Sequence, residues 1–310
     1  MRNIVTILLI CILGLLDLSA KEKIVQKSGS MPSWVKKMEQ GTITASAKGE
    51  TLDAAKDKCM SDIRHQIISS IAVNVTASEN FKTSQITSNE VMSAMTQYDS
   101  NVNTNSAYLP FLTGISVDRV KDFYWEKYYD KEKDSYHYIY HMQYPFTQED
   151  RLAWTAEFIE YDNTQYNKLK QLKENFKTFT DVAYISAAVS QLHELLNYFF
   201  DSVRKAEVET AIKDYVTSAS RITIHPVKQE RGLIIYHLLM DGRKMFFSKK
   251  PHVKSGSAYE INVVQNPDNT YTITYNSEMC TQMDDNSIEV SHILEGRRVK
   301  NVFYFTVDRK

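Results

Sequence analysis

The sequence predicts an α+β protein with three successive regions. Residues 41–49 alternate apolar and polar side chains and precede an apolar stripe of helical period, which indicates a strand followed by a helix. Residues 147–218 carry helical periodicity, whereas the chain after residue 220 alternates short strands with turn signals. We therefore expect a small α/β layer domain over 32–146, a helical hairpin over 147–218 and a C-terminal all-β sandwich over 221–310.

The first twenty residues have the pattern of a secretory signal peptide. One positive charge precedes an apolar run over 4–16, and Ala20 supplies a small residue at the expected cleavage point. The run is shorter than the roughly 18 to 20 residues that span a bilayer, so an uncleaved anchor or a lipid on Cys11 is the less favoured alternative. We expect residues 1–20 to be removed and residues 21–31, which are polar and without periodicity, to form a flexible tether.

The α/β domain begins with the strand over 41–49, whose apolar side chains are small enough for a helix to pack closely. Thr51 can cap that helix, and Asp53 complements the positive end of its dipole. Val73 and Val75 favour the start of a strand, so the expected helix has about 20 residues. Its apolar stripe consists of Leu52, Ala55, Cys59, Ile63, Ile67 and Ile71.

An aromatic hairpin is the feature that stands out most. Residues 115–129 and 135–144 are rich in β-branched and aromatic side chains and are joined by a charged turn, which predicts two long antiparallel strands. Aromatic faces with hydroxyl groups can bind sugar rings or peptides, although they also form ordinary cross-strand pairs. The candidate ligand-binding surface consists of Trp125, Tyr128, Tyr136, Tyr138 and Tyr140.

The helical region begins at Thr147, which starts a capping-box pattern. A helix follows over 152–179, with a candidate interruption at Asp162-Asn163. A second helix after Thr180-Asp181 has a broad apolar face, and two such helices with a short joint would pair antiparallel. A further helical piece over 206–216 leads to the boundary with the last region.

The last region contains turn signals at regular intervals, namely Asp241-Gly242, Asn266-Pro267-Asp268-Asn269 and Glu295-Gly296. About seven strands in roughly 90 residues indicate a β-sandwich, of which an immunoglobulin-like fold is one type. The Cys, Trp, Cys hallmark of antibody domains is missing.

Composition argues against several classes of function. The chain has 37 basic and 38 acidic side chains without a long basic run, so a nucleic-acid partner is not expected. Nine glycines and the absence of GxGxxG or GxxxxGK patterns argue against nucleotide binding, and no cofactor is expected.

No catalytic or metal-binding residue can be assigned from the sequence. His137 and His141 share a strand face but are separated by roughly 13 Å, too far to share one ion. The HxH, HExxH and GxSxG patterns are absent. A site assembled from distant residues stays open. Cys59 and Cys280 fall in different regions, which favours two free thiols over a disulfide bridge.

Three features of the N-terminal region resemble a known family. They are Trp34 within Pro-Ser-Trp-Val, the small-residue strand over 41–49, and the helix through Ala54, Ala55 and Ile63 to Val73. Residues 32–144 thereby resemble the N-terminal part of the twenty-kilodalton outer-membrane lipoprotein family of bacteria. The resemblance implies a Gram-negative envelope protein with a compact α/β domain and no established catalytic residues. This chain lacks the lipidated cysteine of that family, so outer-membrane anchoring does not follow.

Together these observations predict a non-enzymatic exported protein of the periplasm or outer-membrane periphery that binds or assembles an envelope protein or a glycan. Peripheral association with the outer membrane is compatible with this prediction, and the oligomeric state is left open. One alternative is a carbohydrate-binding module that uses the tyrosine-rich hairpin, and another is an envelope hydrolase. A third is a helical-hairpin protein that assembles through residues 150–216.

Overall fold

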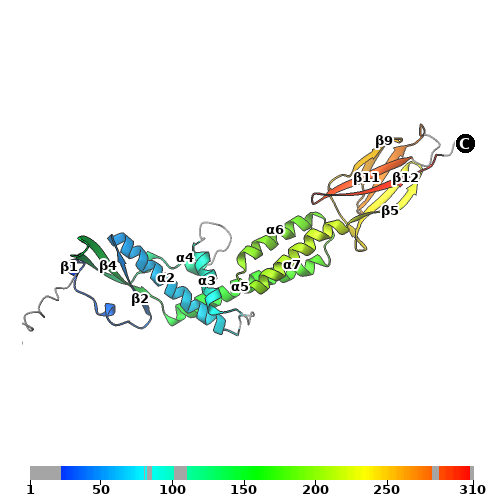
Figure 1. Cartoon of the computed structure of the whole chain (residues 1–310). Helices are drawn as coiled ribbons and strands as arrows, with labels where there is room; N and C mark the ends of the chain where they lie inside the picture. Colours follow the sequence, from blue (N-terminus) through cyan, green and yellow to red (C-terminus); the bar gives the residue numbers. More distant parts are fainter. Residues whose placement is uncertain (1–21, 80, 82–85, 101–109, 281–285, 308–310) are drawn as a thin grey trace, which may run out of the picture. The chain divides into compact units, whose positions relative to one another are not determined.

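In the computed structural model, the residues described are 22–79, 81, 86–100, 110–280 and 286–307, so the predicted signal peptide lies outside them. They form two compact units, one ending at Asn163 and the other beginning at Thr164. Both units combine helices with antiparallel sheets (Figure 1), so the α+β class is confirmed. The units differ from the three predicted regions, because one helix contributes residues to both.

The first unit contains a four-stranded antiparallel sheet of order β1-β3-β4-β2. Its strands are β1 (Glu22–Lys27), β2 (Thr42–Gly49), β3 (Asp122–Asp130) and β4 (Ser135–Pro145). The pair β3 and β4 is the predicted aromatic hairpin. Its first strand was predicted to begin at residue 115, but β3 begins at Asp122, because a 3-10 turn over Val117–Arg119 precedes it.

Strand β1 corrects the prediction of a flexible tether over 21–31. It pairs with the edge of β3, from Glu22 opposite Asp130 to Lys27 opposite Glu126. Most of its side chains are exposed, so its sequence lacks the alternation that marks a half-buried strand. Backbone pairing at a sheet edge, rather than side-chain burial, places this segment.

The helices of the first unit are α2 (Leu52–Ala77), α3 (Ser88–Ser100), α4 (Pro110–Thr113) and the first part of α5 (Gln148–Phe176), with 3-10 turns η1 (Ser33–Val35) and η2 (Val117–Arg119). Helix α2 packs against β2 and β4 (Figure 1). The side chain of Thr51 caps it by accepting a hydrogen bond from the backbone N–H of Ala54. A Cβ atom on Gly49 would lie 2.4 Å from the backbone nitrogen of Ala55, so only glycine permits this close approach.

Two predicted helix limits were wrong. Helix α2 continues through Val73 to Ala77, because Ala72 and Val75 extend the buried stripe by one more turn. Helix α5 runs without interruption through Asp162-Asn163 over 29 residues. Its predicted capping box is confirmed, since Thr147 and Asp150 exchange hydrogen bonds of 2.9 and 3.1 Å.

The helical part of the second unit has three helices, the predicted antiparallel pair and a third helix that is longer than the piece predicted over 206–216. They are the end of α5, α6 (Ala183–Tyr198) and α7 (Ser202–Ser218). Side-chain bonds from Lys168 to Glu194 and from Asn175 to Tyr184 show that α5 and α6 run antiparallel. Asp201 caps α7 and extends it beyond the predicted start at residue 206.

The rest of the second unit consists of η3 (Ala219–Arg221) and two antiparallel sheets. Their strands are β5 (Thr223–Glu230), β6 (Leu233–Met240), β7 (Arg243–Met245), β8 (His252–Ser255), β9 (Tyr259–Gln265), β10 (Thr270–Asn276), β11 (Ser287–Leu294) and β12 (Arg297–Tyr304). One sheet has the order β5-β6-β10-β9 with β7 on β6, and the other has the order β12-β11-β8. Turns at Asp241-Gly242 and Glu295-Gly296 adopt positive φ, as the sequence predicts.

Aromatic side chains join these two sheets. The rings of Tyr236 and Tyr271 on one sheet stack 5.0 Å apart, and the ring of His292 on the other lies 5.0 Å from Tyr271. The hydroxyl of Tyr236 and Nε2 of His292 are hydrogen-bonded at 3.0 Å. All three residues are at most 1% exposed, so they form the centre of this core.

Candidate ligand-binding surface

The sheet of the first unit carries different side chains on its two faces. Directly opposite residues of an antiparallel pair point to the same face. Trp125 lies opposite Tyr140, and Tyr129 lies opposite Tyr136, so these four rings share one face. Tyr128, one residue along, points to the other face.

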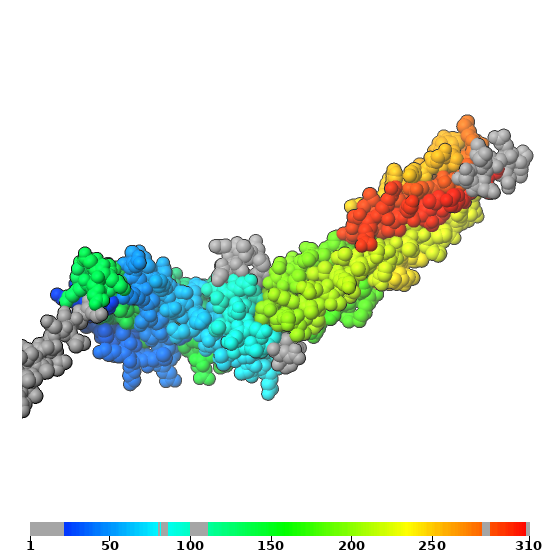
Figure 2. Space-filling model, in the orientation of Figure 1, coloured from blue at the N-terminus to red at the C-terminus, as the bar shows by residue number. Residues whose placement is uncertain are grey.

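Helix α2 covers only part of the first face. The thiol of Cys59 on α2 donates a hydrogen bond of 3.2 Å to the carbonyl oxygen of Ala45 on β2. Ala47, the next residue of β2 on this face, lies opposite Tyr140, which is 5% exposed. Phe123 on β3, farther from the helix, is 53% exposed. Figure 2 shows the surface of the β3–β4 hairpin in green beside α2 in blue.

The open part of this face is a row of rings that we call the aromatic strip, made up of Phe123, Trp125, Tyr129, Tyr136 and Tyr138. Ring centroids lie 6.0 Å apart for Trp125 and Tyr138, and 5.2 Å apart for Tyr129 and Tyr136. Tyr136 is 54% exposed, whereas Trp125 and Tyr138 are half-buried. The Nζ atom of Lys127 lies 4.6 Å from the ring centre of Tyr136 and 5.4 Å from that of Tyr138. The strip therefore combines apolar ring faces with one cation.

Three of the five predicted surface residues, Trp125, Tyr136 and Tyr138, belong to the aromatic strip. Tyr128 points to the opposite face, and Tyr140 is buried beneath α2, so neither adds to this surface. Sequence reasoning missed Lys127, although its place directly opposite Tyr138 follows once the hairpin register is known.

Part of the opposite face is covered by the segment between β1 and β2. Trp34 in η1 is 5% exposed and donates its Nε1–H to Asp122 at 2.7 Å. The carboxylate of Glu39 accepts hydrogen bonds from Gln143 at 2.9 Å and from Lys121 at 2.8 Å. These contacts hold the segment across the face.

A buried carboxylate lies on this second face. Glu126 is 4% exposed and accepts hydrogen bonds from the hydroxyls of Tyr124 at 2.8 Å and Tyr128 at 2.5 Å. Burial, together with the carboxylate of Glu126, raises the pKa of each tyrosine to about 12. Both hydroxyls therefore stay protonated near neutral pH and satisfy the buried carboxylate oxygens with hydrogen bonds.

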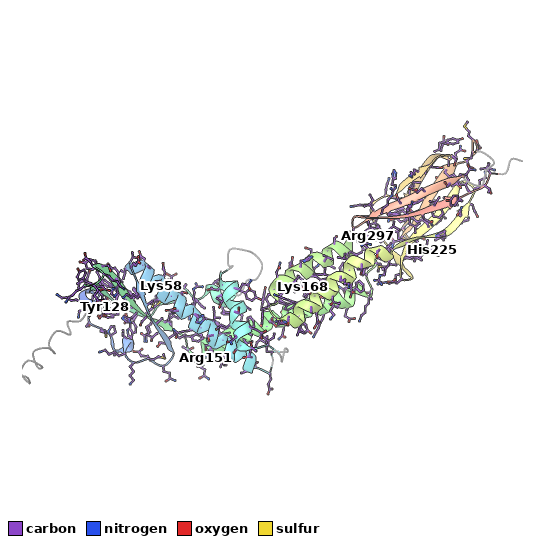
Figure 3. All side chains as sticks on the ribbon, in the orientation of Figure 1. Lys58, Tyr128, Arg151, Lys168, His225 and Arg297 are labelled. Carbon is purple, nitrogen blue, oxygen red and sulfur yellow. The ribbon has the colours of Figure 1, made fainter. Side chains whose placement is uncertain are left out.

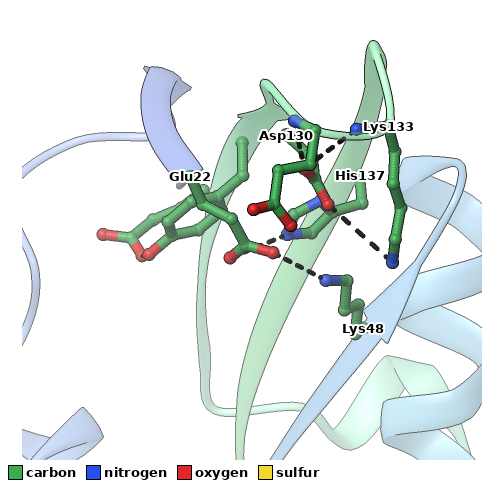
Figure 4. Close-up of polar contacts among 8 residues, drawn as sticks. Glu22, Lys48, Asp130, Lys133 and His137 are labelled. Carbon is green, nitrogen blue, oxygen red and sulfur yellow. Dashed lines mark hydrogen bonds and ion pairs between the residues drawn. The ribbon is translucent and has the colours of Figure 1, made fainter. Parts of the chain in front are cut away.

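Figure 4 shows the polar contacts at the end of this face. Lys48 forms an ion pair of 3.1 Å with Glu22, and Nε2 of His137 lies 3.6 Å from the same carboxylate. The ring of His137 stacks on Tyr128 (labelled in Figure 3) at 5.3 Å. Burial lowers the pKa of His137, and Lys48 lowers it further. The contacts link β1 to β2 and β4, which indicates a structural role.

Ser46 and His141 lie side by side on the same face of the sheet. The Oγ atom of the exposed Ser46 lies 2.7 Å from Nδ1 of His141, within the range of a nucleophile and its general base. Burial lowers the pKa of His141, and its ring stacks on Tyr124. Neither Ser46 nor His141 lines the cavity of about 690 Å³ between the 38–43 segment and the start of α5.

The described residues contain no group of three or more His, Cys, Asp or Glu side chains that could hold a metal ion. Cys59 and Cys280 are both buried and free, as the sequence favours. Burial raises the pKa of Cys59 to about 12, so its thiolate is scarce at neutral pH.

Comparison with protein-family models, with curated proteins and with solved structures found no match. Among the helices that the structure describes, none combines the length and the apolar character needed to cross a bilayer.

Proposed function

We propose that this chain is an exported, non-catalytic binding protein of the Gram-negative cell envelope, in the periplasm or at the outer-membrane periphery, and that its aromatic strip binds a carbohydrate. The single observation that carries the proposal is the row of rings that α2 leaves uncovered. Phe123 is 53% exposed and Tyr136 is 54% exposed, beside the half-buried Trp125 and Tyr138.

The physical basis is the rigidity of these rings. Each ring pairs with a neighbour across the strands, so little conformational entropy is lost when a ligand stacks on it. Ring faces offer apolar contact, while the tyrosine hydroxyls and the Lys127 ammonium offer hydrogen bonds to sugar oxygens. A sugar ring has the same combination of an apolar face and polar rim.

The cellular setting of the proposal comes from the sequence. The leader over 1–20 and the resemblance of 32–144 to the outer-membrane lipoprotein family support an envelope location. We further propose that the two sheets of the second unit form an immunoglobulin-like sandwich, which would serve as a scaffold or a second contact surface.

The test is a glycan array followed by calorimetric titration of the best ligand into the mature chain. Trp125→Ala and Tyr138→Ala should each weaken binding by roughly 30-fold, since loss of a central aromatic contact costs about 2 kcal/mol. Tyr304→Ala is the matched control, because Tyr304 is 63% exposed on β12 in the other unit and should leave affinity unchanged. Equal affinity of all variants would exclude the strip as the site. If no glycan binds, but a protein binds the wild type and not the aromatic-strip variants, the ligand of the strip is a protein.

A second candidate, an envelope hydrolase, is favoured by one observation, the 2.7 Å contact of Ser46 and His141. A fluorophosphonate probe should then label wild-type protein and fail to label Ser46→Ala. Absence of labelling in the folded wild-type chain would remove this candidate.

A further inference from the structure

Two histidines face each other on the outer side of the larger sheet in the second unit. His225 on β5 lies directly opposite His237 on β6 in the strand register. Their rings are nearly parallel, with an interplanar angle of 11° and centroids 5.3 Å apart. His225 is exposed at the surface (labelled in Figure 3), so solvent and ions reach the pair from its side.

The ring of His237 has unused hydrogen-bonding capacity. Both of its nitrogens are buried, and neither has a hydrogen-bond partner among the described residues. An unsatisfied buried nitrogen costs free energy that a ligand could recover. Burial, Lys244 and His225 all lower the pKa of His237, whereas Asp268 opposes them, so the ring is neutral at pH 7. A neutral imidazole is the form that binds metal ions.

The strand register provides the geometry of a chelate. Side chains directly opposite on antiparallel strands start from Cβ atoms about 4.5 to 5.5 Å apart. Two imidazole nitrogens that share one ion at about 2.1 Å each must lie roughly 3 to 4 Å apart. Rotation of the exposed His225 ring about its own side-chain bonds can supply that approach, because the two backbones are already held in place.

We propose that His225 and His237 form a two-histidine site for a transition-metal ion of the Zn²⁺, Ni²⁺ or Cu²⁺ type, with water completing the coordination. Two nitrogen ligands favour these ions over Mg²⁺ and Ca²⁺, which prefer oxygen. The nearby Lys244 weakens the site, and Asp268 partly compensates. The site is independent of the aromatic strip, which lies in the other unit.

The test is calorimetric titration of Zn²⁺ into the mature chain without a histidine tag, at pH 7.5 and again at pH 5.5. We expect one equivalent to bind, with at least tenfold weaker binding in His225→Asn and in His237→Asn. His252→Asn is the matched control, because His252 is exposed on a strand of the other sheet, and it should bind like wild type. Binding should weaken at pH 5.5, since protons compete for the ring nitrogens.

Several outcomes would overturn the proposal. The proposal is wrong if the wild type does not bind Zn²⁺ at 1 mM. It is also wrong if His225→Asn binds Zn²⁺ as tightly as the wild type, or if the His252→Asn control loses as much affinity as the two site variants. His225→Asn changes an exposed side chain, so its fold should survive, and a circular dichroism spectrum matching wild type verifies this. Mg²⁺ serves as the negative control and should give no heat of binding.

Discussion

The buried His292 should make the second unit sensitive to acid. His292 is 1% exposed among aromatic rings, and burial lowers its pKa from 6.5 to about 4. The unfolded chain therefore binds a proton at a higher pH than the folded chain does. The contribution of His292 to the free energy of unfolding is fully present above pH 6.5 and is lost as the pH falls from 6.5 toward 4. Below pH 4 it changes little. Between pH 7.5 and 4.5 this one group should cost about 2.5 kcal/mol of unfolding free energy.

The measurement is urea unfolding of the full chain at several pH values. All three tryptophans, Trp34, Trp125 and Trp154, lie in the first unit, so their fluorescence reports that unit alone. Acid-tolerant labelling of the buried Cys280 with a pyridyl disulfide, read by peptide mass spectrometry, reports the second unit.

The decisive comparison is between His292→Gln and wild type. The variant should be less stable at pH 7.5, because packing around Tyr236 is altered, but its stability should fall less on acidification. His252→Gln, at an exposed position, should keep the wild-type pH dependence. An unchanged slope in His292→Gln would refute the reasoning.

Two further substitutions test the packing of each unit. Gly49→Ala should destabilise the first unit by about 1 to 3 kcal/mol, because the new methyl group would collide with the backbone of Ala55, and the shift of tryptophan fluorescence in urea measures it. Asp201→Ala should cost about 3 to 5 kcal/mol in the second unit, since it removes the cap of α7 and the carboxylate beside the buried Arg204. Glu174→Ala removes an exposed ion pair and should change the free energy of unfolding by less than about 0.5 kcal/mol. If Glu174→Ala destabilised the protein as much as Asp201→Ala does, burial would not be the reason for the effect at Asp201.

The sequence predicted those elements in which apolar side chains recur at a regular spacing or a clear turn signal is present. Helix α2, the aromatic hairpin and the turn at Asp241-Gly242 all combine local signals with a buried face, and all are present. Strand β1 was missed because backbone pairing with a strand that lies far away in the sequence, such as Glu22 with Asp130, leaves no local pattern. The interruption predicted at Asp162-Asn163 was wrong: Asp162 is 2% exposed inside a continuous helix, and such a local environment overrides low helix propensity.

The sequence predicted several of the residues of the candidate surface, but it could not predict which of them are exposed. Alternation places Tyr136, Tyr138 and Tyr140 on one face, but the distinction between open and covered rings depends on where α2 crosses the sheet. The His225 and His237 pair depends in the same way on strand register, which neither residue's local sequence defines.

The start of β1 at Glu22 has a consequence for the proposed removal of a leader. If the leader ends at Ala20, a single residue separates the peptidase cleavage bond from the first paired residue of the sheet. One residue of extended chain spans only about 3.5 Å, too little to reach into a protease cleft while the strand stays paired. On the proposal of a cleaved leader, we therefore expect the peptidase to act before Glu22 pairs with Asp130, so that the last strand to join this sheet is added only to the processed chain.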